Sequence, residues 1–236
     1  MLVETTFDFR TDARTDDPDQ SSPTLRRYHQ LLWSKPLPSG HAFDLDVTTA
    51  WTYLHHSSDI GEYFLSSDSV IATYSYWQST AELMHQLPKS DVERFEAIGY
   101  TIGGMMIFPS NRVDGKHTIN MARGMNRRIA DRMDMTLECV RRYYSGDIHT
   151  PLGATLARYD DFFALFNDFR GYVDFFLLQD LLIDGRVKFF TDFDNFATAA
   201  VPGDLATYTR FRDASIAFVV ARNERIESWV AVNLSR

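Results

Sequence analysis

The stretch TIGGMMIFPSNRVDGKHTINMARGMNRRIADRMDMTLECVRRYY, residues 101–144, decides the predicted fold. Its apolar start, residues 101–109, predicts a β-strand. Asp114 and Gly115 form the residue pair that accepts the left-handed dihedrals of a tight hairpin turn. We therefore expect the chain to return as a second strand over residues 116–120 and to form a small antiparallel hairpin.

A long helix is predicted directly after this hairpin. Asn120 is a good N-cap, and the helix is expected to run to about Tyr144 and to stop at Ser145-Gly146. At 100° per residue one side of this helix is apolar and is expected to pack on the core. The residues on that side are Ile129, Met133, Thr136, Leu137, Val140 and Tyr144.

The flanking segments predict a mostly helical protein. Residues 151–183 carry aromatic side chains at helical spacing, which is typical of a buried core. A closing helix is expected from about Asp204 to Val232, whereas the polar residues 11–23 predict an exposed loop. We predict an α+β fold with one small antiparallel element and a single domain over residues 1–236.

Composition excludes several classes of protein. The chain has 236 residues with 44% apolar and 24% charged side chains, which is ordinary globular usage. Its net charge of −8 argues against a protein that coats nucleic acid indiscriminately. The acidic N-terminus, the single cysteine and the short apolar runs favour a cytoplasmic protein without a membrane segment.

Positive charge is concentrated in one part of this acidic chain. Residues 112–128 contain five Lys and Arg residues against Asp114 alone. Together with the free N–H groups of the expected helix start, they predict a site for an anion. The alternative is that these cations pair with acids elsewhere in the chain. The predicted ligand-binding residues are Asn111, Arg112, Lys116, Asn120, Arg123, Asn126, Arg127 and Arg128.

The second half of the same helix is expected to be structural. Glu138 precedes Arg142 by four residues, a spacing at which the two side chains can form an ion pair. Cys139 is expected near the edge of the polar side of this helix.

A second group of cations lies at residues 26–35, where Tyr28 and Trp33 are interleaved. This group suits either base stacking or solvated cations beside buried aromatics.

An enzyme is the main alternative to a binding protein. Arginine beside carboxylate on one helix is a combination that phosphoryl chemistry can use, as in a nuclease or a group-transfer enzyme. The weak catalytic candidates are Asp131, Glu138, His55 and His117. Motifs for a metal site, a nucleophilic serine or a nucleotide-binding loop are absent, so we predict neither a metal nor a cofactor.

Several motifs resemble those of a family of uncharacterised bacterial proteins. They include SPTLRRYHQLLWSKPLPSG at residues 22–40 and ARGMNRRIADRMDMTLECVRRYY at residues 122–144. The resemblance extends over almost the whole chain and implies a single-domain bacterial protein of the cytoplasm. It implies no activity and no catalytic residues. Met133 and Met135 stand where relatives more often have Phe and Leu, a change that a core tolerates.

Three hypotheses about function follow from the sequence. The first is a protein that binds a phosphate-bearing ligand, RNA or a nucleotide, at residues 111–128, which would suit a role in stress or phage defence. The second is the nuclease or group-transfer enzyme described above. The third is an interaction protein that forms a homodimer through its aromatic-rich helices at residues 156–183 or 211–230.

Overall fold

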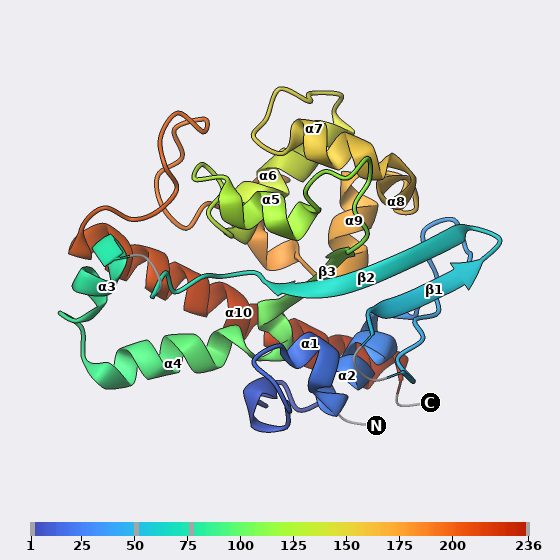
Figure 1. Ribbon diagram of the computed structural model, residues 1–236, viewed down its shortest axis with the longest axis horizontal. Helices are drawn as coiled ribbons and strands as arrows, with labels where there is room; N and C mark the ends of the chain where they lie inside the picture. The colour runs from blue at the N-terminus through green and yellow to red at the C-terminus, as the bar shows by residue number, and fades with distance from the viewer. Residues whose placement is uncertain (1–2, 50–51, 76–77, 235–236) are drawn as a thin grey trace.

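The computed structural model describes residues 3–49, 52–75 and 78–234. It shows the predicted α+β fold, in which helices predominate and the strands form small antiparallel sheets (Figure 1). The helices are α1 Pro18–Ser21, α2 Pro23–Trp33, α3 Gln78–Met84, α4 Lys89–Gly99, α5 Ile119–Met125, α6 Met133–Tyr144, α7 Gly153–Leu156, α8 Asp160–Ala164, α9 Phe169–Phe176 and α10 Leu205–Asn233. The strands are β1 Leu54–Ser58, β2 Gly61–Ser69, β3 Met105–Pro109, β4 Leu182–Ile183 and β5 Arg186–Val187.

The main sheet differs from the predicted hairpin. Strand β3 does form where it was expected, but it pairs with β2, which in turn pairs with β1. Asp114 and Gly115 do adopt left-handed dihedrals, with φ values of 54° and 67°. The segment after them is not a strand, because Thr118 caps α5 by accepting a hydrogen bond from the N–H of Met121.

The predicted long helix is in fact two helices. α5 ends at Met125 and α6 begins at Met133, so the prediction of one continuous helix, with Asn120 as its cap, is wrong. Ala130 and Asp131 between them adopt left-handed φ values of 48° and 57°. The hydroxyl of Tyr74 donates to the carbonyl of Ala130 at 2.7 Å. A contact from a distant part of the chain therefore fixes a break that the helical periodicity does not reveal.

The N-terminal segment is also more ordered than predicted. Residues 14–17 are exposed as predicted, whereas Pro18–Ser21 form α1, in which Pro18, Asp19 and Ser21 are buried. The Asp19 carboxylate accepts hydrogen bonds from the N–H and the hydroxyl of Ser67, at 3.0 and 2.9 Å. These bonds tie α1 to β2, so the second half of the segment packs against the sheet.

The long helix α10 connects the main sheet to α9. It begins at the predicted position, with Asp204 as its N-cap. In the second half of α10 the buried Arg222 donates to the carbonyls of Gly103, Met105 and Phe176 at 2.8–2.9 Å. These bonds join α10 to β3 and to α9, and Figure 1 shows α10 running behind the sheet.

The aromatic segment forms core, as predicted. Its side chains pack ring against ring in one continuous apolar cluster that also includes residues from α2, β3 and α10. The buried members of the segment are Leu156, Tyr159, Phe162, Phe163, Phe166, Tyr172, Phe175, Phe176 and Leu178. These buried rings therefore form the interior of the protein, and a homodimer through residues 156–183 or 211–230 stays a prediction.

Candidate functional site

Arg123 does not face solvent, contrary to the prediction that it binds a ligand. Its side chain is completely buried and forms an ion pair with Asp68. The guanidinium also donates to the hydroxyl of Thr136 at 3.0 Å and to the carbonyl of Asp131 at 2.8 Å. The positive charge of Arg123 is therefore neutralised inside the protein. For this residue the structure shows the alternative prediction, a pair with an acid elsewhere in the chain.

Two further predicted ligand-binding residues also have internal roles. The amide of Asn120 donates to the hydroxyl of Ser66 and to the carbonyl of Ser67, at 3.3 and 3.4 Å. The amide of Asn126 donates to the carbonyl of Pro151 at 3.2 Å. These asparagines connect α5 to the sheet and to the segment before α7.

The remaining predicted residues lie on the surface. Asn111, Arg112, Lys116, Arg127 and Arg128 are all exposed. We call Arg112, Lys116, Arg127 and Arg128 the basic surface. Within the described ranges, no carboxylate lies at ion-pair distance from Arg112, Lys116 or Arg128. The helix start beside them offers less than expected, because α5 has only seven residues and is capped by Thr118.

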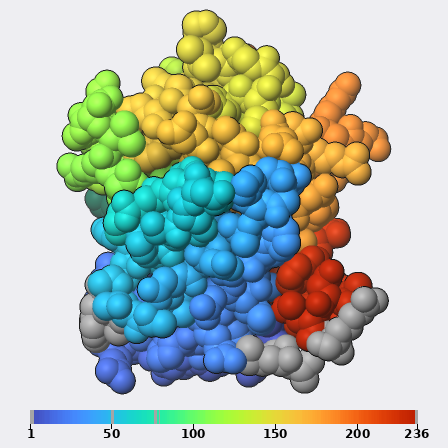
Figure 2. Space-filling view, turned by 90° about the vertical axis from the view of Figure 1, so that its right-hand side faces the viewer, coloured from blue at the N-terminus to red at the C-terminus, as the bar shows by residue number. Residues whose placement is uncertain are grey.

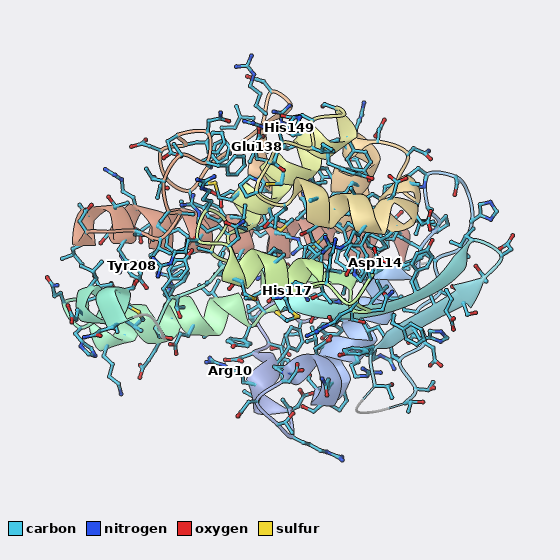
Figure 3. The ribbon with its side chains drawn as sticks, turned by 45° about the horizontal axis from the view of Figure 1, so that its top comes forward. Arg10, Asp114, His117, Glu138, His149 and Tyr208 are labelled. Atoms are coloured by element: carbon cyan, nitrogen blue, oxygen red, sulfur yellow. The ribbon has the colours of Figure 1, made fainter. Side chains whose placement is uncertain are left out.

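The four weak catalytic candidates do not come together. Glu138 accepts from both Arg141 and Arg142, at 2.7–2.8 Å, so the predicted ion pair with Arg142 is present. His55 lies on β1, where it contacts Glu62 at 3.0 Å. Figure 3 shows Glu138 well separated from His117, which lies beside α5. Asp131 lines a cavity together with a second carboxylate whose pKa is raised, whereas His55 lines a separate cavity beside Asp46.

Asp131 lines a cavity of about 310 Å³ together with Asp68, at the end of β2. Figure 3 shows Arg10, another lining residue, on the opposite side of the molecule from Glu138. The Arg10 guanidinium stacks on the ring of Tyr100 at 4.6 Å and lies 3.9 Å from Glu96. We call this space the Asp68–Asp131 cavity.

The electrostatics of this cavity act mainly on Asp68. Its side chain is 28% exposed, and one carboxylate oxygen accepts from the N–H of Ser69 at 2.9 Å. Burial raises the pKa of Asp68 to about 6, against the lowering effect of Arg123 and with a further contribution from the negative charge of Asp131. Asp68 can therefore gain or lose a proton close to neutral pH, as an acid–base group must.

Strained backbone surrounds the same cavity. Tyr74, Ala130 and Asp131 all have left-handed φ values, of 60°, 48° and 57°. For residues other than glycine this conformation costs on the order of 1 kcal/mol each, and such strain collects at functional sites. A Cβ atom added to Gly124 would lie 3.2 Å from both carboxylate oxygens of Asp131. The backbone of α5 thus packs directly against this carboxylate.

Asp68 is the residue that sequence reasoning missed. It lies in the sequence Ser67-Asp68-Ser69, which matches no catalytic motif. No strand or motif is predicted around it from the sequence, so no local signal singles it out. Its partners Arg123 and Asp131 lie more than 50 positions further along the chain, so only the folded structure shows the constellation.

The described residues offer little for a metal or a nucleophilic thiol. Among them, no group of three or more His, Cys, Asp and Glu side chains is arranged to hold a metal ion. Cys139 is buried and not at the edge of a polar face as predicted. Burial raises the pKa of its thiol to about 11, so the reactive thiolate is disfavoured. The groups available for chemistry in the Asp68–Asp131 cavity are therefore carboxylates and a guanidinium.

The fold and the cavity define an α+β protein with a buried Asp–Arg pair beside a second aspartate. Over residues 3–226 the chain matches a family described as a family of unknown function, DUF6994, and it belongs to that family. The predicted membership of an uncharacterised family is thereby confirmed. No match was found among curated proteins or among solved structures. None of the described helices has the length and apolar character that crossing a membrane requires.

Proposed function

We propose that this protein is an enzyme that uses Asp68 and Asp131 for general acid–base chemistry, in a hydrolysis or a group transfer. The observation that carries the proposal is that both carboxylates line one cavity while Asp68 has a pKa of about 6. Paired carboxylates whose environments differ are a recurring way to provide an acid and a base at one site.

The two aspartates have different roles in this proposal. Asp68 in its ionised form accepts a proton from water or from a substrate hydroxyl as that oxygen attacks. Asp131 provides the negative charge that helps to keep the pKa of Asp68 high. Arg123 is a positioning residue, because it is buried behind Asp68 and fixes the carboxylate through their ion pair.

Chromogenic substrates test this proposal. We expect the wild-type protein to hydrolyse at least one of two esters, p-nitrophenyl phosphate and p-nitrophenyl acetate. Asp68→Asn and Asp131→Asn should each lower that rate by about 10²-fold or more. Asp184→Asn is the matched control, because Asp184 is exposed in the β4–β5 turn. Equal rates for all three variants, or no hydrolysis by the wild type, would refute the proposal.

Binding of a phosphate-bearing ligand at the basic surface is a second candidate function. It is favoured by Arg112, Lys116 and Arg128, which are exposed and lack carboxylate partners among the residues described. Such cations attract RNA or a nucleotide, and the affinity falls as the salt concentration rises. The acidic remainder of the chain would disfavour long duplexes and favour a compact ligand.

Fluorescence anisotropy with a labelled single-stranded RNA and a labelled ATP tests this second candidate. The triple variant Arg112→Glu, Lys116→Glu and Arg128→Glu should abolish salt-sensitive binding. Arg186→Glu, which changes an exposed arginine on β5, is the control and should bind as the wild type does. Unchanged binding by the triple variant would exclude the basic surface as the site.

A further inference from the structure

Lys35 lies in an enclosure of aromatic rings just after α2. Its Nζ atom is 4.7 Å from the ring centroid of Trp229, 4.9 Å from that of Phe175 and 5.5 Å from that of Trp33. These rings belong to α10, α9 and α2. Figure 2 shows the C-terminal end of α10, in red, beside the N-terminal part of the chain, in blue. We call the three rings the Lys35 cage.

The amine of Lys35 has no polar partner among the residues that the structure describes. In the described part of the chain, neither a hydrogen-bond acceptor nor a carboxylate lies within bonding distance of its Nζ. The other lysines, Lys89, Lys116 and Lys188, are all exposed, and Lys89 pairs with Glu93 at 3.1 Å. Lys35 is thus the one lysine of this chain that is withdrawn from water.

A second cation lies against the same cage. The Arg222 guanidinium is 5.7 Å from the Trp33 ring, is fully buried, and donates to three backbone carbonyls. Those bonds hold its charge in place, so the lysine is the group that can relieve the repulsion by losing a proton.

The protonation of Lys35 follows from these surroundings. Burial first and Arg222 second lower the pKa of Lys35 to about 8, while the nearby Asp174 carboxylate acts in the opposite direction. Asp174 itself lies 3.6 Å from Arg170 on the same helix. The faces of the aromatic rings favour the ammonium form, whereas the loss of hydration favours the amine. A lysine that is desolvated beside another cation is the arrangement that activates an amine as a nucleophile.

We propose that Lys35 is an acyl-accepting amine, modified by small activated acyl donors of the acyl phosphate class. The lone pair of the neutral Nζ attacks the carbonyl carbon, and a C–N bond forms. The bond between that carbon and the phosphate oxygen breaks, and the phosphate leaves with the electron pair. The proton lost from nitrogen passes to the phosphate, so the products are an amide and inorganic phosphate.

Competitive acetylation of the intact protein tests the proposal. The protein is treated with acetyl phosphate at pH 7.5, and the modification at each of the four lysines is followed by peptide mass spectrometry. Lys35 should react on the order of tenfold faster than Lys116 and Lys188, because far more of its amine is neutral. Its rate should level off above pH 8, whereas the other rates keep rising. A rate for Lys35 equal to or below that of Lys188 would overturn the proposal.

Two variants separate activation from simple shielding. Trp229→Ala opens the cage, so Lys35 should become hydrated and its rate should fall towards that of the exposed lysines. A rise would show that the cage only hinders access, and would overturn the proposal.

Asp174→Asn changes a half-exposed side chain and so leaves the fold intact. Because it removes the carboxylate that opposes deprotonation, it should raise the rate roughly twofold or more. An unchanged or lower rate would contradict the proposed activation.

Discussion

The buried guanidinium of Arg123 on α5 forms an ion pair with the partly exposed carboxylate of Asp68 at the end of β2. The pair joins residues 55 positions apart and borders the cavity that Asp131 also lines. Burying two charges is costly, and removing one partner leaves the other uncompensated. The pair therefore ties the stability of the protein to the candidate site.

Arg123→Met is expected to destabilise the protein strongly. The substitution keeps much of the side-chain volume but leaves Asp68 without its cation, which should lower the free energy of unfolding by about 3–5 kcal/mol. Arg128→Met is the control, because Arg128 is exposed and should change stability by less than about 0.5 kcal/mol. Urea denaturation followed by circular dichroism measures both. Similar midpoints for the two variants would contradict the structural role of Arg123.

Asp19 is expected to make stability depend on pH in an unusual direction. Burial raises the pKa of Asp19 to about 6, against the lowering effect of its bonds from Ser67, whereas the unfolded chain titrates near 4. Between pH 6 and pH 4 the native state then holds more protons than the unfolded state. For this group, the free energy of unfolding therefore rises as the pH falls.

Asp19→Asn removes that contribution. Relative to the wild type, the variant should lose about 2 kcal/mol more stability at pH 4.5 than at pH 7. Asp184→Asn corrects for the other carboxylates, because Asp184 lies in an exposed turn. Urea denaturation at the two pH values provides the comparison. A difference that is independent of pH would show that Asp19 titrates normally.

Glu138 is expected to matter for stability and not for catalysis. Although burial alone would raise the pKa of Glu138, hydrogen bonds from Arg141 and Arg142 hold it below its usual value. Glu138→Gln should therefore lower the free energy of unfolding by about 1–3 kcal/mol. The rate with any active p-nitrophenyl ester should stay within twofold of the wild-type rate. A loss of activity as large as that of Asp68→Asn would place Glu138 in the catalytic machinery.

The sequence predicts those parts of the fold that depend on neighbouring residues. The start of the closing helix near Asp204, the aromatic periodicity that includes Phe166 and the pair of Glu138 with Arg142 are all local, and all are present. The break between α5 and α6 is not local, because it depends on Tyr74 and its bond to Ala130. Periodicity extends a helix through such a break because it contains no information about distant partners.

The candidate site shows the same limit. Asp131 is selected because it is a carboxylate beside arginine on one expected helix, whereas the isolated positive charge of residues 112–128 suggests that Arg123 faces a ligand. The carboxylate that neutralises Arg123 lies on β2. A count of the charges within residues 112–128 cannot reveal a partner outside that segment. The interior position of Arg123 follows only once the sheet places Asp68 beside α5.

Gly124→Ala should separate stability from activity at the Asp68–Asp131 cavity. Gly124 lies within α5, where alanine is favoured over glycine by about 0.5–1 kcal/mol, so the helix itself should not be weakened. The new methyl group would lie 3.2 Å from both Asp131 carboxylate oxygens and must push that carboxylate aside. We expect a midpoint of urea unfolding close to that of the wild type, together with a tenfold or larger loss of ester hydrolysis. Gly203→Ala is the control, because no atom lies within 4 Å of a Cβ added there. If Gly124→Ala keeps full activity, the position of Asp131 is unimportant for the reaction and its assignment as a catalytic residue is wrong.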